Sequence, residues 1–265
     1  MRIQGISGSR GVAVGNVYKY IQEEIVIPDY EVTDDQVEAE IGKFASAMAA
    51  TLKQLDTIRQ KALVDMGSDE AAIFEAHMQI AQDPSLSDGI KSLVEHSKMN
   101  VVAATAQTIE TFAAIFIGMD DPYMRERGAD IKDIGDRLMR NMLGMNPRGL
   151  SHISGEVIIV AHDLAPSDTA SLDKNVVKGI VTAAGGPTSH AAIMARTLEI
   201  PAVMGVGNIE SFTDDVRAVV LGTDGEVITE PSDEDWERYT KEAVDFQDEL
   251  KRLKDSANLE AVTKD

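Results

Sequence analysis

Apolar residues recur at steps of three and four between residues 33 and 144, the spacing of one buried face on an α-helix. The first such stripe runs from Val37 to Ile58. It follows Thr33–Gln36, which has the form of a helix-capping box. The pattern therefore predicts a long amphipathic helix that begins at the capping box.

Three further helical segments are expected, each marked by a start or stop signal. They begin near Ser68, with a break at Asp83-Pro84-Ser85, near Asn100, and at Asp121-Pro122, where the last segment ends at Gly144. Short connections between such helices favour an antiparallel bundle.

The pattern on either side of this region is different, with short runs of β-branched residues between glycines and turn residues. Strands are expected in the opening stretch from Ile3 to Gly15 and at Glu24–Ile27, Glu156–Ala161, Gly179–Ala183, Ala202–Gly205, Val216–Leu221 and Glu226–Thr229. Residues 222–225 read as a hairpin turn, and helical stretches are expected at Ser167–Leu172 and Ser189–Leu198. Strands alternating with helices are typical of an α/β domain.

These patterns predict an α/β plus all-α protein. The α/β domain is expected to be discontinuous, formed by residues 1–30 and 146–230. The antiparallel helical bundle of residues 33–144 is inserted in it, and residues 231–265 form a C-terminal linker helix.

Composition narrows the classes of function. With 45 acidic and 25 basic residues the formal net charge is −20, which disfavours binding to nucleic acid or to anionic membranes and favours a basic protein partner. The absence of cysteine excludes disulfides and thiol chemistry. No apolar run approaches the roughly 20 residues of a membrane span, and the start lacks a signal-peptide core, so we expect a cytoplasmic protein.

The segment from Ala183 to Arg196 carries the clearest candidate chemistry. A strand ends in Gly185-Gly186, two hydroxyl residues follow at Thr188 and Ser189, and His190 opens a helix of small residues. Paired glycines allow a sharp turn and the close approach of a bulky group. The first helical turn offers unpaired N–H groups to a phosphate, and it disfavours positive charge on the histidine, which leaves a ring nitrogen free to attack phosphorus. Hydroxyl and guanidinium donors for the phosphate are Thr188, Ser189 and, if it faces the site, Arg196.

Other interpretations of the histidines are weaker. A capped helix followed by a surface histidine would be the ordinary reading of an isolated Thr-Ser-His sequence. His162-Asp163 as a metal pair rests on two adjacent residues only, and we predict no metal site. A hydrolase based on Ser189 and His190 lacks a G-x-S-x-G motif, and sequence neighbours rarely face each other as nucleophile and base.

The stretch from Gly185 to Gly205, GGPTSHAAIMARTLEIPAVMG, strongly resembles the phosphohistidine motif of the phosphoenolpyruvate-utilising enzymes. In this family, which includes Enzyme I, pyruvate phosphate dikinase and phosphoenolpyruvate synthase, the histidine that matches His190 is phosphorylated on a ring nitrogen. The opening strands, the helical region and the segment Asp163–Asp173 resemble the N-terminal part of Enzyme I in family order.

The resemblance implies a mechanism in which the histidine takes a phosphoryl group from phosphoenolpyruvate and passes it reversibly to a histidine of the carrier protein HPr. It implies that phosphoenolpyruvate and Mg²⁺ are bound by a C-terminal domain of the same enzyme, which this chain lacks, so no cofactor is expected here. It also implies that the intact enzyme is a homodimer, whereas we expect this chain to be a monomer.

The resemblance also assigns residues. Thr169 matches the threonine that hydrogen-bonds the active histidine. The face that contacts HPr is implied to include the following positions: Asp69, His77, Met78, Ile80, Asp83, Leu86, Phe116, Met124, Arg127 and Lys132.

Three alternatives stay open at this point. The chain could be a detached phosphohistidine domain of a dikinase or synthase, although no phosphate-cradling glycine loop precedes it. It could be a nitrogen-related paralogue of Enzyme I with its own HPr-like carrier. It could also be a docking module in which His190 is vestigial, which the intact motif argues against.

Overall fold

The computed structural model of the protein describes residues 1–21, 23–145, 150, 153 and 155–257. It divides into two compact units. The sheet unit contains Met1–Ile21, Ser151–Leu164 and Leu172–Asp265, and the helical unit contains Gln22–Leu150 and Ala165–Ser171. The predicted fold class, an α/β domain interrupted by a helical bundle, is confirmed.

The sheet unit is built on one eight-stranded sheet with the order β1-β8-β7-β3-β4-β5-β6-β2. The strands are β1 (Arg2–Gln4), β2 (Ile6–Ser9), β3 (Val12–Tyr20), β4 (Val157–Ala161), β5 (Val177–Thr182), β6 (Ala202–Met204), β7 (Arg217–Leu221) and β8 (Glu226–Thr229). Strands β3, β4, β5 and β6 run parallel, and the outer strands pair antiparallel. The carboxyl ends of the parallel strands therefore share one edge of the sheet, where loops after the strands can converge.

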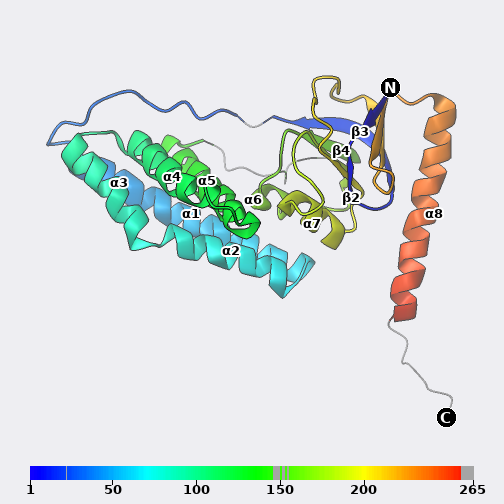
Figure 1. Ribbon diagram of the computed structural model, residues 1–265, viewed down its shortest axis with the longest axis horizontal. Helices are drawn as coiled ribbons and strands as arrows, with labels where there is room; N and C mark the ends of the chain where they lie inside the picture. The colour runs from blue at the N-terminus through cyan, green and yellow to red at the C-terminus, as the bar shows by residue number, and fades with distance from the viewer. Residues whose placement is uncertain (22, 146–149, 151–152, 154, 258–265) are drawn as a thin grey trace, which may run out of the picture. The chain divides into compact units, whose positions relative to one another are not determined.

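Both faces of the central strands are buried, as their nearly continuous Val and Ile content requires of parallel strands. Ile158, Val160 and Val181 pack in one core cluster with other strand residues and with Phe212, which lies in the connection between β6 and β7. Two helices in this unit are α7 (His190–Thr197) and α8 (Asp233–Ala257), and α8 packs against β3 (Figure 1). Leu221 of β7 pairs with Glu226 of β8 across the turn between them, so the predicted hairpin is confirmed.

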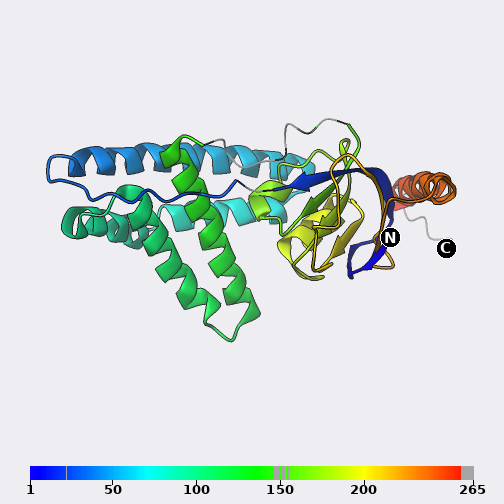
Figure 2. The same cartoon turned by 90° about the horizontal axis from the view of Figure 1, so that it is seen from above.

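The helical unit contains α1 (Val37–Asp65), α2 (Ser68–Ala81), α3 (Pro84–Ser97), α4 (Val101–Ile117) and α5 (Pro122–Leu143), together with the four-residue helix α6 (Pro166–Thr169). Figure 2 shows α4 and α5 as an antiparallel hairpin beside α1. Their apolar faces meet in a cluster that contains Phe44, Ile90, Ile109, Ile134 and Leu138. The predicted long stripe, the break at Pro84 and the stop at Gly144 all appear at the expected places.

Two local predictions need correction. Glu24–Ile27 is not a strand, and the carbonyls of the residues on either side of it are bound by side chains of the helical unit. Arg140 donates to Glu23 O, and Asn100 donates to Pro28 O at 2.8 Å. At the first helix only half of the capping box forms: Gln36 Oε1 accepts from Thr33 N at 3.1 Å, and the cap position is Gln36 itself.

An ion pair ties the start of the first helix to the end of the third. Lys98, in a left-handed conformation after α3, lies 2.5 Å from Asp34 Oδ1. This hydrogen bond lowers the pKa of the Asp34 carboxyl below its usual value. The pair, together with the isolated bridge between Glu31 and Met99, fixes the chain that leads into α1.

The predicted domain bounds and the observed units differ at Ala165–Ser171. This segment was expected to belong to the α/β domain, but it packs with the helical unit. The C-terminal helix, expected as a separate linker, clusters with the sheet unit.

Candidate functional site

His190 lies at the edge of the sheet formed by the carboxyl ends of the parallel strands. Strand β5 ends at Thr182, the chain turns through the glycine pair, and α7 begins at His190. His162 follows the end of β4 at the same edge, and its carbonyl accepts a hydrogen bond from Ala184 N at 2.9 Å. In α/β folds this edge is where loops after neighbouring strands form binding sites.

The turn before His190 depends on glycine. Gly185 has φ +89° and Gly205, in the loop after β6, has φ +66°, conformations that L side chains rarely adopt. A Cβ at Gly205 would also lie 3.1 Å from Gly185 O, so the two loops touch through their backbones. Ala183 O accepts from Gly207 N at 3.0 Å, and this bond joins the loops again. Around Gly186 a Cβ would meet nothing within 4 Å, which leaves open space on the outer side of the turn.

Ser189 is the N-cap of α7. Its Oγ accepts from Ala192 N at 3.3 Å and donates to Gly186 O at 2.9 Å, so the hydroxyl joins the helix to the glycine turn. A hydroxyl engaged on both sides in this way is poorly placed to act as a nucleophile. The hydrolase interpretation of the Ser189-His190 pair therefore has no geometric support.

The surroundings of His190 suit an anion. The first turn of a helix leaves amide groups without intrahelical acceptors, and here these include the amides of His190 and Ala191. Thr188 is exposed beside them, and His190 itself is half-buried. The site thus presents an accessible imidazole together with hydrogen-bond donors for the oxygens of a phosphoryl group.

Arg196, predicted as a possible phosphate ligand, lies near the other end of α7. Its Nη1 donates to Gly8 O in β2 at 2.7 Å. This bond anchors α7 to the edge of the sheet. The guanidinium is therefore directed to β2, and its predicted contact with phosphate stays a prediction.

Thr169 lies at the end of α6 and belongs to the helical unit. Its hydroxyl donates within its own turn, to Pro166 O at 2.9 Å and to Ala165 O at 3.2 Å. Because the proton is used there, the lone pairs of the oxygen can accept another hydrogen bond. The two units are described separately, so the predicted bond between Thr169 and His190 stays a prediction.

The predicted partner-binding residues all lie in the helical unit, on α2, at the start of α3, and on α4 and α5. Asp69, Asp83 and Lys132 are exposed, whereas Met78, Ile80, Phe116, Met124 and Arg127 are half-buried. Asp83 also caps α3, since its Oδ1 accepts from Ser85 N at 2.8 Å. Lys132 pairs with Glu110 of α4 at 3.1 Å.

Two residues of the predicted face need correction. Leu86 is 2 % exposed and is part of the bundle core, and His77 is 0 % exposed. A side chain that is fully buried offers no surface to a partner. Their side chains face the interior because the apolar stripe of α3 and the inner side of α2 pack against neighbouring helices.

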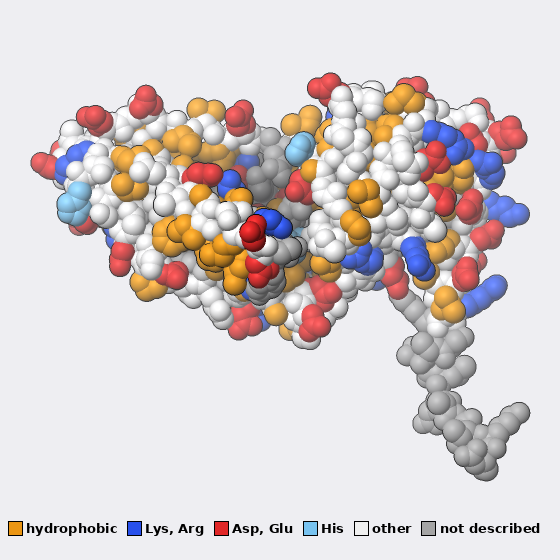
Figure 3. Space-filling view, viewed as in Figure 1, with side chains coloured by type: hydrophobic (Ala, Val, Ile, Leu, Met, Phe, Trp, Pro, Cys, Tyr) orange, Lys and Arg blue, Asp and Glu red, His pale blue; other side chains and the backbone are white. Residues whose placement is uncertain are grey.

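Exposed apolar side chains gather where α4 ends. Ile115, Ile117 and Met119 are 57 %, 43 % and 38 % exposed. Figure 3 shows hydrophobic side chains on this face of the helical unit, with acidic side chains around them. An apolar surface rimmed by charge is typical of a docking site for another protein.

Sequence reasoning missed a group of buried charged residues on α5. Asp130, Asp133, Arg137 and Arg140 are all at most 5 % exposed, and they recur at steps of three and four beside the apolar stripe. This spacing was readable in the sequence. Charged residues at helical spacing are usually assigned to a solvated face, however, and only the fold shows that this row is covered.

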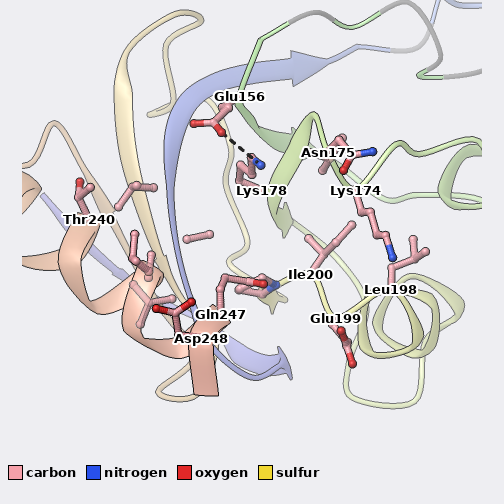
Figure 4. Close-up of a pocket in the computed structure, with 17 residues that line it drawn as sticks. Glu156, Lys174, Asn175, Lys178, Leu198, Glu199, Ile200, Thr240, Gln247 and Asp248 are labelled. Carbon is pink, nitrogen blue, oxygen red and sulfur yellow. Dashed lines mark ion pairs between the residues drawn. The ribbon is translucent and has the colours of Figure 1, made fainter. Parts of the chain in front are cut away.

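A hollow of about 540 Å³ opens in the sheet unit between α8, the start of β3 and the start of β5 (Figure 4). Lys178 and Glu156 form an ion pair of 3.2 Å at its wall. The hollow lies at the amino ends of β4 and β5, opposite the edge that carries His190. It is therefore separate from the candidate site.

Within the described part of the chain, no cluster of three or more histidine, aspartate or glutamate side chains is arranged to hold a metal ion. Among the same residues, no helix combines the length and the apolar character that crossing a membrane requires.

Comparison with known proteins shows similarity to one family along nearly the whole chain. Residues 4–127 match the model of the PEP-utilising enzyme N-terminal domain, and residues 153–225 match that of the PEP-utilising enzyme mobile domain. A phosphoenolpyruvate-protein phosphotransferase of Listeria monocytogenes is 41% identical over 267 residues, which is 99% of this chain and 46% of that protein. The protein of the same name from Priestia megaterium is 39% identical over 264 residues, again 46% of its length. The chain thus spans about half the length of the curated relatives it matches.

Two solved structures resemble this chain in fold. A solution structure described as Enzyme I (nEIt) superposes with a TM-score of 0.79 at 36% identity and covers 92% of this chain and 99% of that one. The N-terminal domain of a nitrogen-type Enzyme 1 superposes with a TM-score of 0.60 at 24% identity, which shows a common fold and no more.

Proposed function

The chain belongs to the Enzyme I group of the PEP-utilising enzymes, and from this premise we propose that His190 carries a phosphoryl group between phosphoenolpyruvate and the carrier protein HPr. The observation that supports the proposal best is the placement of His190 at the start of α7, after a glycine turn with open space on its outer side. The matched relatives are about twice as long as this chain. In the intact enzyme, the first transfer from phosphoenolpyruvate would therefore need their remaining part, together with Mg²⁺.

The transfer between HPr and His190 is a simple exchange. A ring nitrogen of His190 attacks the phosphorus of phospho-HPr, a new P–N bond forms, and the P–N bond of the donor breaks. The electron pair of the broken bond stays on the imidazole of HPr, and the reverse reaction follows the same path. Such a transfer depends mainly on in-line positioning and on stabilising the charge of the phosphoryl oxygens.

Thr188, Ser189 and Thr169 each have a part in this proposal. The exposed hydroxyl of Thr188 and the free amides of the first turn would bind the phosphoryl oxygens, while Ser189 holds α7 against the turn. The hydroxyl of Thr169 already donates its proton to a carbonyl of α6. Its oxygen would therefore accept a hydrogen bond from the N–H of one ring nitrogen of His190. That leaves the lone pair on the other nitrogen for attack on phosphorus. No metal is expected in this step.

The helical unit would supply the surface for HPr. The exposed and half-buried residues of the predicted face would contact the carrier together with the apolar end of α4, and the net charge of −20 would attract a carrier with a basic rim. His77 and Leu86 are not proposed as contacts. We place the exchange in the cytoplasm and expect this chain to act as a monomer.

The test is to mix the chain with a small excess of phosphorylated HPr, without Mg²⁺, and to record the intact masses of both proteins. We expect one phosphoryl group on the chain, labile in acid and stable in base, with a matching loss from HPr. The His190→Ala variant should stay unmodified, and His162→Ala, which removes an exposed histidine at the same edge of the sheet, should behave as wild type. If the wild-type chain accepts nothing from HPr or from a nitrogen-type HPr homologue, the proposal is wrong.

A further inference from the structure

A buried group of ionisable residues joins two helices of the helical unit, α2 and α5. His77 of α2 is completely buried, with Nε2 3.1 Å from Asp130 Oδ1 and Nδ1 3.9 Å from Asp133 Oδ2. Arg127 lies 3.8 Å from the other oxygen of Asp130. Buried charges are costly unless they are paired, so such a group is retained only where it is compensated or has a use. In the proposed exchange Arg127 belongs to the HPr-binding face, whereas His77, Asp130 and Asp133 have no part assigned to them.

Asp133 connects this group to the segment that carries Thr169. Its Oδ1 accepts a hydrogen bond of 3.1 Å from Ser167 Oγ, and both side chains are buried. Ser167 stands two residues before Thr169 in the four-residue helix α6. One carboxylate thus lies between His77 of α2 on one side and α6 on the other.

The segment Ala165–Ser171 is too short to hold its own position. An isolated helix of four residues is unstable, so its place must come from its contacts. Besides the bond to Asp133, Lys61 of α1 donates to Ser171 O at 2.9 Å, and Ser171 Oγ accepts from Leu150 N at 3.1 Å. These contacts explain why the segment packs with the helical unit although the residues on either side of it belong to the sheet unit.

We propose that Asp133 is a positioning residue for the phosphoryl exchange, which acts through Ser167 to hold the hydroxyl of Thr169 where it can orient His190. The inference rests on the proposed function and adds a residue to it. Hydrogen-bonded groups around a reacting atom must be held within about 0.5 Å to be effective, and the bond from Ser167 ties α6 to another helix two residues before Thr169. Asp133 also lies beside the buried His77, with Oδ2 3.9 Å from His77 Nδ1.

The test starts from Ser167→Ala, because the removal of Asp133 would take away one of the two carboxylates beside the buried His77 and could unfold the helical unit. The rate of phosphorylation of the chain by phospho-HPr is measured by rapid quench as a function of HPr concentration. We expect the plateau rate to fall about ten-fold, since a small misplacement of an orienting group has effects of this order or more. The half-saturating HPr concentration should change by less than about two-fold, because the docking surface is untouched.

A double-mutant comparison separates positioning from a general loss of stability. Thr169→Ala alone should slow the plateau rate, and Ser167→Ala added to it should cause no further loss, because Ser167 acts through Thr169. The control is Thr108→Ala, which removes another buried hydroxyl of the helical unit. That hydroxyl donates to Ala104 O within its own helix at 2.8 Å, so the rate should stay at the wild-type value.

The outcomes are distinguishable. A wild-type chain that accepts no phosphoryl group contradicts the proposed function itself. If the wild-type chain is phosphorylated normally, the inference is overturned by an unchanged rate in Ser167→Ala or in Thr169→Ala. It is also overturned if Ser167→Ala slows the Thr169→Ala variant as much as it slows the wild type.

Discussion

Ser189 illustrates how a residue next to a reactive group can act by holding its surroundings. Its hydroxyl caps α7 through Ala192 N and holds the glycine turn through Gly186 O. The residue is therefore needed to present the imidazole of His190, even though its own oxygen is committed to the backbone. This role differs from that proposed for Thr188, whose side chain is exposed.

We expect Ser189→Ala to lower the free energy of unfolding by about 1 kcal/mol, the usual cost of losing an N-cap hydroxyl. The measurement is urea unfolding followed by circular dichroism. Thr188→Ala is the matched control and should change stability by less than about 0.5 kcal/mol. Equal losses of stability in the two variants would contradict the cap assignment.

At the scale of elements, α8 is held on the sheet by a close fit to the turn between β2 and β3. A Cβ at Gly11 would overlap the ring of Phe246, and the φ of Gly11 is +114°. Nearer the start of α8, Trp236 and Tyr239 pack against Val12, Val14 and neighbouring strand residues. This helix is thus an integral part of the sheet unit, and the glycine is what lets it lie so close.

Gly11→Ala should loosen α8, because the added methyl group meets the Phe246 ring and the residue must leave a conformation that alanine rarely adopts. Hydrogen exchange should show faster exchange of the α8 amides, while the amides of α1 stay as in the wild type. Gly42→Ala is the control. It adds a methyl group in open space within α1 and should stabilise the protein by about 0.5–1 kcal/mol. Unchanged exchange in α8 would show that the contact with Phe246 does not hold the helix.

At the scale of the whole molecule, the chain passes between its two units four times, at residues 21–22, 150–151, 164–165 and 171–172. Each unit nevertheless has its own core, with Leu55 fully buried in the helical unit and Ile158 fully buried in the sheet unit. Separate cores favour separate local opening reactions, even when the units share several connections.

Core substitutions should therefore act mainly on their own unit. Leu55→Ala and Ile158→Ala should each cost about 2–5 kcal/mol. In native-state hydrogen exchange the first should lower protection of the helices between residues 37 and 143, and the second should lower that of the strands. The two variants serve as controls for each other, and an equal loss of protection across the whole chain in both would mean that the molecule unfolds as one unit.

Much of the architecture could be predicted from the sequence because its signals are local. The stripe that follows Gln36, the cap at Asn100, the break at Pro84 and the glycine pair before His190 each depend on residues a few positions apart. The fold class and the family followed from these and from the motif around His190. The bounds of the domains and the roles of individual site residues stay predictions.

The predictions that were wrong concern features that depend on contacts between residues far apart in the sequence. Glu24–Ile27 has strand composition, but the carbonyls of the residues that flank it are bound by side chains of helices. His77 and Leu86 match a partner-binding face in sequence, yet other helices cover them. Burial is a property of what packs on top of a residue, and a single helix does not carry that information.

The sequence by itself thus determined most of the elements, the fold class and the position of the candidate histidine at a helix start, because helix periodicity, strand composition and the glycine turn are encoded within short stretches. Only the tertiary structure placed Ala165–Ser171 with the helical unit and put Asp133 between His77 and Ser167. His77 and Asp133 are 56 positions apart along the chain, and Asp133 and Ser167 are 34 positions apart. Such contacts arise when separate elements pack so that buried polar groups meet their partners.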